Sequence, residues 1–204
     1  MRLSRATAIA VLTACMLAAP AFAGYEYPLQ SPEIRDAYFL GLQKDQQTIE
    51  CLKAYAKRWN QTQSTKYIIS EVDVMTPYMQ IVERGMGQAP GDSEVQAETD
   101  LRAHPLRFLV KASVYFNTAF PNAAPNGAEE QGSGHSFSAK LSQGHAIVPL
   151  RTTVDSIYAR HGPSGVMITV EVDPAKISSA PLHVIVNTPD GQSVSADFDL
   201  SKLK

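Results

Sequence analysis

The sequence predicts an α+β fold in which an N-terminal pair of helices packs against an antiparallel β-sandwich. Two observations predict this class. Apolar residues recur at helical spacing in the first part of the mature chain, whereas from about residue 66 they alternate with polar residues at period two. Such alternation is typical of strands that have one packed face and one solvated face, as in antiparallel sheets.

Residues 1–23 have the pattern of a cleavable export signal. Arg2 and Arg5 give a positive start, residues 6–19 are almost entirely apolar, and a small-x-small cleavage site ends at Ala23. We therefore expect cleavage near Ala23 and a periplasmic or secreted protein. The apolar stretch is too short for a spanning helix, and no later apolar segment approaches that length.

An alternative interpretation of the same leader is a lipid anchor. Residues 12–15 fit the bacterial lipobox pattern, in which Cys15 becomes lipidated. The apolar region before Cys15 would then be very short, and the better cleavage site would remain unused downstream. We therefore prefer cleavage near Ala23.

Residues 24–65 are expected to form a helical segment. Ser31, Pro32 and Glu33 predict a helix start, because serine caps free backbone N–H groups, proline is tolerated in the first turn and glutamate suits the positive end of the helix dipole. A second helix is expected over residues 45–59, where the apolar residues fall on one stripe.

Residues 66–204 are expected to form a β-rich domain of immunoglobulin-like or C2-like general architecture, which implies no function. Period-two patterns predict strands over residues 67–74, 106–117, 136–141, 145–153 and 166–172, with a final hairpin over 182–187 and 193–200. Helices are expected near 76–86 and 93–103. A polar loop at 118–136 is too long for an ordinary hairpin turn.

Composition excludes several classes of function. The 204 residues carry a net charge of -2 without a basic run, which argues against sequence-independent binding of nucleic acid. The chain has two cysteines, and only Cys51 lies beyond the leader. An intramolecular disulfide framework and a multi-cysteine zinc site are therefore excluded from the mature protein.

Cys51 lies on the second predicted helix, beside its apolar stripe. We expect it to be a half-buried apolar residue, which is the usual role of a free cysteine. An odd cysteine in an exported protein also allows an intermolecular disulfide. A catalytic thiol would need a cation or histidine aimed at it, and the nearby Lys53 and Lys57 face elsewhere.

Candidate chemistry is sparse. His135 and His145 are the closest pair among the five histidines, and they would meet if they began neighbouring strands, but their spacing matches no metal motif. They support an alternative hypothesis of a secreted hydrolase or metal-dependent enzyme, with Glu129 or Glu130 also at the site. Carboxylate pairs at 71/73 and 197/199 each project from one strand face, as any solvated strand would.

The sequence therefore favours a non-enzymatic binding or envelope-associated interaction module. It contains an expected export signal, a β-rich domain and a long polar loop, and it contains no motif for catalysis or for a cofactor. We expect no cofactor, and we expect the partner to be a protein or an envelope component. Residues 118–136 are the first candidate for the contact surface.

Overall fold

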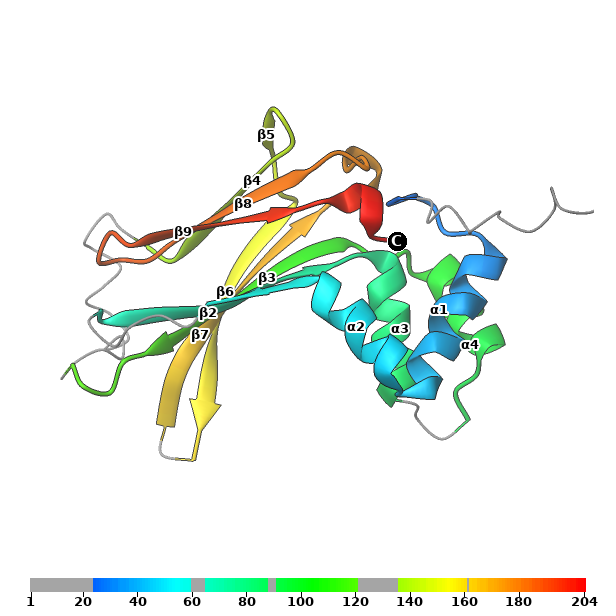
Figure 1. Cartoon of the computed structure of the whole chain (residues 1–204), viewed down its shortest axis with the longest axis horizontal. Helices are drawn as coiled ribbons and strands as arrows, with labels where there is room; N and C mark the ends of the chain where they lie inside the picture. The colour runs from blue at the N-terminus through cyan, green and yellow to red at the C-terminus, as the bar shows by residue number, and fades with distance from the viewer. Residues whose placement is uncertain (1–23, 60–64, 88–90, 121–135, 161) are drawn as a thin grey trace, which may run out of the picture.

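The computed structural model describes residues 24–59, 65–87, 91–120, 136–160 and 162–204. Within these ranges, four helices gather at one end of two antiparallel sheets (Figure 1). The predicted α+β class is therefore confirmed. The sandwich architecture and the division at residue 65 stay predictions.

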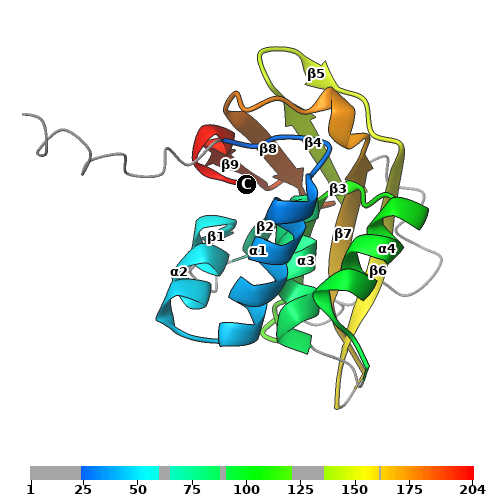
Figure 2. The same cartoon turned by 90° about the vertical axis from the view of Figure 1, so that its right-hand side faces the viewer.

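The helices cluster on one side of the molecule (Figure 2). They are α1 (Ser31–Gln43), α2 (Gln46–Ala54), α3 (Pro77–Gly87) and α4 (Glu94–Ala103), and single 3-10 turns occur at η2 (Pro174–Lys176) and η3 (Leu200–Lys202). At the start of α1 the Glu33 carboxylate accepts a 2.7 Å hydrogen bond from the Gln30 backbone N–H. Gln30 is the N-cap residue, and Ser31, the predicted cap, donates its hydroxyl to Glu98 on α4 instead.

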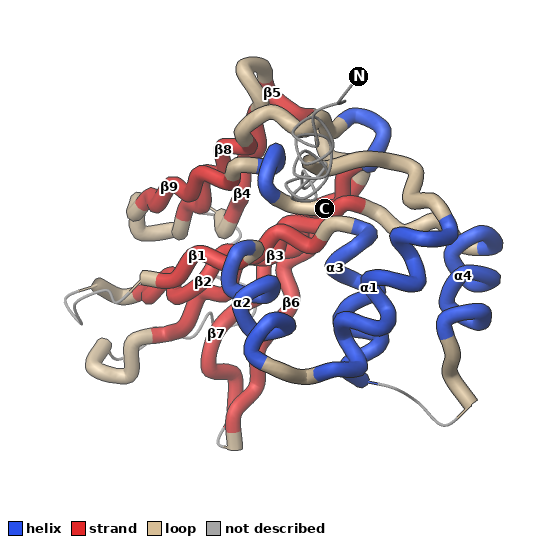
Figure 3. The backbone as a smooth tube through the Cα atoms, turned by 45° about the vertical axis from the view of Figure 1, so that its right-hand side comes forward, coloured by secondary structure: helices blue, strands red, loops and turns tan. Residues whose placement is uncertain are grey.

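The strands form one sheet of five and one of four, drawn red in Figure 3. The larger sheet has the order β1 (Ala56–Arg58), β2 (Tyr67–Met75), β3 (Phe108–Phe116), β7 (Gly162–Val172) and β6 (Arg151–Ala159). The smaller sheet has the order β5 (Ala146–Ile147), β4 (Ser138–Ser142), β8 (Leu182–Asn187) and β9 (Ser193–Phe198). Strand β6 is thus an edge of the larger sheet.

Both sheets and the helices contribute to a single hydrophobic core. On β3, Val110, Ala112 and Val114 are buried, and on β8 Val184 and Val186 are buried, as their period-two pattern predicts. The predicted strands that became β2, β3, β8 and β9 are confirmed within two residues at their ends. The helices expected near 76–86 and 93–103 are confirmed as α3 and α4.

Two glycines allow α1 and α3 to cross with their backbones in contact. A Cβ atom built on Gly41 would lie 2.1 Å from the Val82 carbonyl oxygen. A Cβ atom on Gly85 would lie 2.3 Å from the Tyr38 carbonyl oxygen. Because both neighbours are backbone atoms, a larger residue at either position would push the two helices apart.

The predicted helix over 45–59 is too long. Asp45 caps α2 by accepting a 3.0 Å hydrogen bond from the Thr48 N–H, but the helix ends at Ala54. The next residues form β1, which pairs with β2, and the Tyr55 carbonyl accepts from the Val74 N–H at 2.9 Å. Pairing with a neighbouring strand therefore overrides the apolar helical stripe.

The predicted strand over 145–153 is also wrong in its bounds. The chain forms β5, breaks around Pro149, and then forms β6, which continues to Ala159. Proline cannot donate to a strand ladder, which accounts for the break. Of the predicted loop, only residues 118–120 and 136 belong to the described ranges, and 121–135 lie outside them.

The first described residues are anchored in the core. Tyr25 is buried, its N–H donates to the Leu200 carbonyl at 2.8 Å, and its hydroxyl donates to the Pro174 carbonyl at 3.0 Å. Its ring also packs edge-on against Phe108. Within the described part of the chain, none of the helices has the length and apolarity needed to cross a membrane.

Candidate functional site

The predicted histidine site is only partly within the described residues. His145 lies in the exposed turn between β4 and β5. His135, Glu129 and Glu130 lie outside the described residues, as does Cys15. Among the residues that the structure places, no group of three or more histidine, cysteine, aspartate or glutamate side chains is arranged to hold a metal ion. The metal-dependent hypothesis therefore gains no support from the described residues.

Cys51 is a half-buried free thiol on α2, as its place beside the apolar stripe predicts. It lines a pocket of about 380 Å³ between α1, α2 and the last residues of the chain, together with Phe39, Leu40, Tyr55 and Tyr78. Burial raises the pKa of the Cys51 thiol, an effect that Lys204 partly offsets. A thiol with a raised pKa is mostly protonated near neutral pH, which makes it a poor nucleophile.

The mouth of this pocket carries charged groups that pair with each other. Lys204 Nζ lies 3.3 Å from the Asp36 carboxylate and 5.4 Å from the centre of the Tyr78 ring. Lys202 also lines the pocket, and its ammonium lies 2.7 Å from Asp199. Both cations thus have carboxylate partners within the fold, and the pocket presents no strong charge to a ligand.

Glu71 and Asp73 project from the same face of β2, as predicted. Arg58 on β1 lies 2.6 Å from the Glu71 carboxylate, and Lys111 faces Asp73 from β3. Burial raises the pKa of the Asp73 carboxyl to about 7, and the neighbouring Glu71 carboxylate adds to the rise. The charged side chains of this cluster thus come from β1, β2 and β3 and face one another across the sheet.

The other predicted carboxylate pair separates into two roles. Asp197 on β9 lies 2.6 Å from the Nδ1 atom of His183 on β8, whereas Asp199 caps η3 and pairs with Lys202. Ser142 on β4 is in register with His183, so the three strands bring a serine, a histidine and an aspartate into one row. The Asp197 side chain is largely solvated and that of His183 is partly exposed, whereas a catalytic histidine needs a sheltered, oriented setting.

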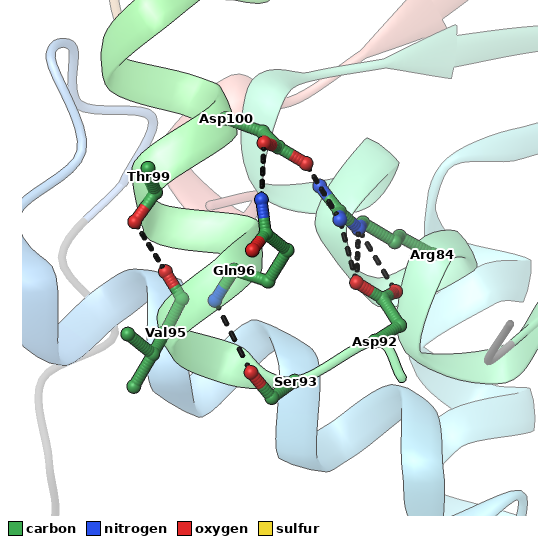
Figure 4. A network of polar contacts seen from close by, with 7 residues as sticks. All are labelled: Arg84, Asp92, Ser93, Val95, Gln96, Thr99 and Asp100. Atoms are coloured by element: carbon green, nitrogen blue, oxygen red, sulfur yellow. Dashed lines mark hydrogen bonds and ion pairs between the residues drawn. The ribbon is translucent and has the colours of Figure 1, made fainter. Parts of the chain in front are cut away.

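A polar network joins α3 to α4 (Figure 4). The Arg84 guanidinium donates to both oxygens of Asp92 and to Asp100, and Gln96 donates to Asp100 at 2.7 Å. Arg84 lowers the pKa of both carboxyls. The charged groups of the network pair with one another, and the network connects the two helices. We therefore assign it a structural role.

The outer edge of β6 is an exposed edge of the larger sheet. The strand runs for nine residues, and in the described residues its only paired neighbour is β7. Seven of its nine residues are exposed, so both its faces meet solvent along most of its length. An edge strand of this kind presents backbone N–H and C=O groups that a further strand can pair with.

Apolar side chains concentrate at this edge. Val148 is 74% exposed, Leu150 52%, Val154 45% and Tyr158 73%. Val154 lies opposite the buried Ile168 of β7 and so shares the face that is the core face elsewhere in the sheet. We call the outer edge of β6 together with these four side chains the β6 edge surface.

Sequence reasoning missed this surface. Residues 154–159 show no period-two apolar pattern, because neither face of β6 is packed, and period-two alternation reports burial of one face. The β-branched content of residues 151–157 was a usable signal, since threonine, valine and isoleucine favour strands. No protein-family model, curated protein or solved structure matches this chain.

Proposed function

We propose that this protein is an exported, non-enzymatic binding module that docks an extended strand of a protein partner on the β6 edge surface. The observation that carries the proposal is a nine-residue strand whose only paired neighbour among the described residues is β7, together with four exposed apolar side chains on it or just before it. Addition of a strand to such an edge gains main-chain hydrogen bonds, and side-chain contacts beside it supply specificity.

The residues of β6 support an edge that accepts a partner. Proteins usually protect edge strands from pairing by placing lysine, proline or a bulge on them. Residues 151–159 contain no lysine and no proline, and their two charges are Arg151 and Asp155. The one irregularity in its pairing with β7 falls between Ile157 and Tyr158, near the far end. The central part of the strand is therefore regular and unprotected.

The finer architecture belongs to the same proposal. We infer that the two sheets form a sandwich of immunoglobulin-like or C2-like general type. Support comes from their shared core, from the placement of β9 beside β2, and from that of β4 beside β7. In this arrangement the smaller sheet reaches as far as β7.

Export with cleavage near Ala23 is also part of the proposal. Support comes from the anchoring of the chain close to that point, because Tyr25 is buried and its N–H donates to the Leu200 carbonyl. We expect the mature protein recovered from the producing cell to begin at Gly24. A mass that includes a lipidated Cys15 would contradict this part of the proposal.

The docking proposal is tested by crosslinking in the producing cell. A photoreactive residue placed at Ser156, which is exposed on β6, should join covalently to a partner protein that mass spectrometry identifies. Val154→Lys should abolish the adduct, because it puts a charge into the apolar part of the edge. The matched control is Val95→Lys on α4, where valine is 59% exposed and the adduct should persist. Absence of an adduct, or one that survives Val154→Lys, would overturn the proposal.

A further inference from the structure

We infer that the partner strand at the β6 edge surface is β6 of a second copy of this chain, paired antiparallel about a two-fold axis through Thr153. This inference rests on the proposed docking function and names its partner. The argument uses the symmetry of strand pairing, the two charges on β6 and the exposed apolar side chains beside it.

Symmetry restricts the registers that self-pairing allows. Directly opposite residues of an antiparallel pair point to the same face of the sheet. A two-fold axis perpendicular to the sheet keeps each side chain on its own face. Since side chains alternate faces along a strand, one residue must lie directly opposite its own copy across the axis, and we call this an axis through that residue. Each possible register of β6 is therefore defined by the residue on the axis.

The charges on β6 select among these registers. Arg151 and Asp155 are four residues apart and lie on one face, opposite Glu171 and Met167 of β7. An axis through Thr153 sets Arg151 of each copy directly opposite Asp155 of the other. An axis through Arg151 or through Asp155 would set like charges against each other, which is unfavourable.

The Thr153 register also extends an existing row of charges. Arg151 faces Glu171 on β7 within its own sheet, so in the dimer it would lie between two carboxylates from different copies. The Thr153 hydroxyl donates a 3.0 Å hydrogen bond to Asp155, which orients that carboxylate on the same face. Two such rows, related by the axis, flank the centre of the interface.

The exposed apolar side chains fit the same register. With Thr153 on the axis, the segment 148–150 that precedes β6 in one copy is placed toward the Tyr158 end of β6 in the other. Val148 and Leu150 of one copy then lie at the level of the Tyr158 region of its partner, and these are the side chains with large exposed fractions. Dimerisation would cover apolar surface that the monomer leaves in water.

Charge reversal tests the inference. Arg151→Glu and Asp155→Lys, each alone, replace two attractive contacts with two repulsive ones per dimer. We expect each to weaken self-association roughly tenfold or more, as measured by sedimentation over a concentration series. An equimolar mixture of the two variants should associate again, because every contact in the mixed dimer joins opposite charges. The double variant Arg151→Glu/Asp155→Lys should also recover. Lys140→Glu, a charge reversal on the exposed part of β4, should leave association unchanged.

The outcomes separate this inference from the proposed function. A wild-type protein that stays monomeric throughout the series overturns the second copy as partner, and so does a dimer that neither single reversal weakens. In either case, an adduct from position 156 to a different protein would keep the docking function. No adduct from position 156 would remove the docking function itself, whatever the oligomeric state of the purified protein.

Discussion

At the scale of single residues, the crossing of α1 and α3 depends on Gly41 and Gly85. Each glycine faces a backbone carbonyl of the other helix at a distance that excludes a side chain. The sequence shows both glycines. It could not show a close crossing, because that depends on which helices meet in space.

Gly41→Ala and Gly85→Ala are therefore expected to destabilise the protein. Each methyl group would force the helices apart, and such overpacking costs about 1–3 kcal/mol in the free energy of unfolding. Urea unfolding of the purified variants measures this loss of stability. Gly87→Ala is the matched control, since no atom lies within 4 Å of its built Cβ. Equal stability of all three variants would show that the helices do not cross this closely.

The raised pKa of Asp73 determines in which direction this residue changes the stability of the fold as the pH rises. Burial and Glu71 raise its pKa from 3.8 to about 7, so the folded protein binds this proton more tightly than the unfolded chain does. The contribution of Asp73 to stability is therefore full below its unfolded pKa of 3.8 and is lost as the pH rises toward about 7. Carboxyls with lowered pKa values, such as Asp92 and Asp100, act in the opposite direction at more acidic pH.

We expect Asp73→Asn to remove this decline. The free energy of unfolding of the wild type, relative to the variant, should fall as the pH rises from 3.8 to about 7 and then level off. Unfolding curves at a series of pH values measure the difference. Glu71→Gln should shift the decline to lower pH, because it removes one cause of the raised pKa. A constant difference between wild type and Asp73→Asn across this range would contradict the assignment.

At the scale of secondary-structure elements, α4 is held to α3 by the Arg84 network. The sequence predicted a helix near 93–103, and Glu98 and Arg102, four residues apart on α4, form an ion pair along it. It did not predict the contact of Arg84 with Asp92 and Asp100, because those residues become neighbours of Arg84 only in the folded protein. Local spacing predicts contacts within one helix and not those between two.

Arg84→Met is expected to loosen α4. The change leaves the Asp92 carboxylate, whose side chain is 8% exposed, without its main partner. Loss of a partner by a buried polar group costs about 1–3 kcal/mol. Hydrogen exchange of the α4 amides and urea unfolding measure the effect, and Arg84→Met/Asp92→Asn should recover part of it. Lys53→Met removes a largely exposed ion pair and should change stability little. If Arg84→Met and Arg84→Met/Asp92→Asn lowered the free energy of unfolding equally, a role for the Asp92 charge would be contradicted.

The β6 strand shows where prediction from periodicity stops. Strands β2, β3, β8 and β9 pack one face, and alternation located them closely. Strand β6 leaves both faces largely in water, so its sequence carries no alternating apolar pattern to detect. The candidate binding surface was missed for the same physical reason that makes it a candidate, namely that nothing in the described fold covers it.

At the scale of the whole molecule, the α+β class followed from the change of period near residue 66. Helical spacing before it and alternation after it are properties of the chain itself. The order of the strands is not such a property, because β7 forms a local hairpin with β6 but pairs on its other side with β3, which lies far away in the sequence. The edge position of β6, on which the proposed function depends, therefore required the structure.

The central claim, that β6 takes a partner strand from a second copy, is tested most directly by amide hydrogen exchange. We predict that exchange in residues 151–159 of the wild type slows as protein concentration rises, because the outward-facing amides become bonded. In the Val154→Lys variant, exchange in residues 151–159 should stay fast at every concentration. The buried amides of β3 should exchange at the same rate in both proteins. Exchange in β6 that is independent of concentration and equal in the two proteins would contradict the claim.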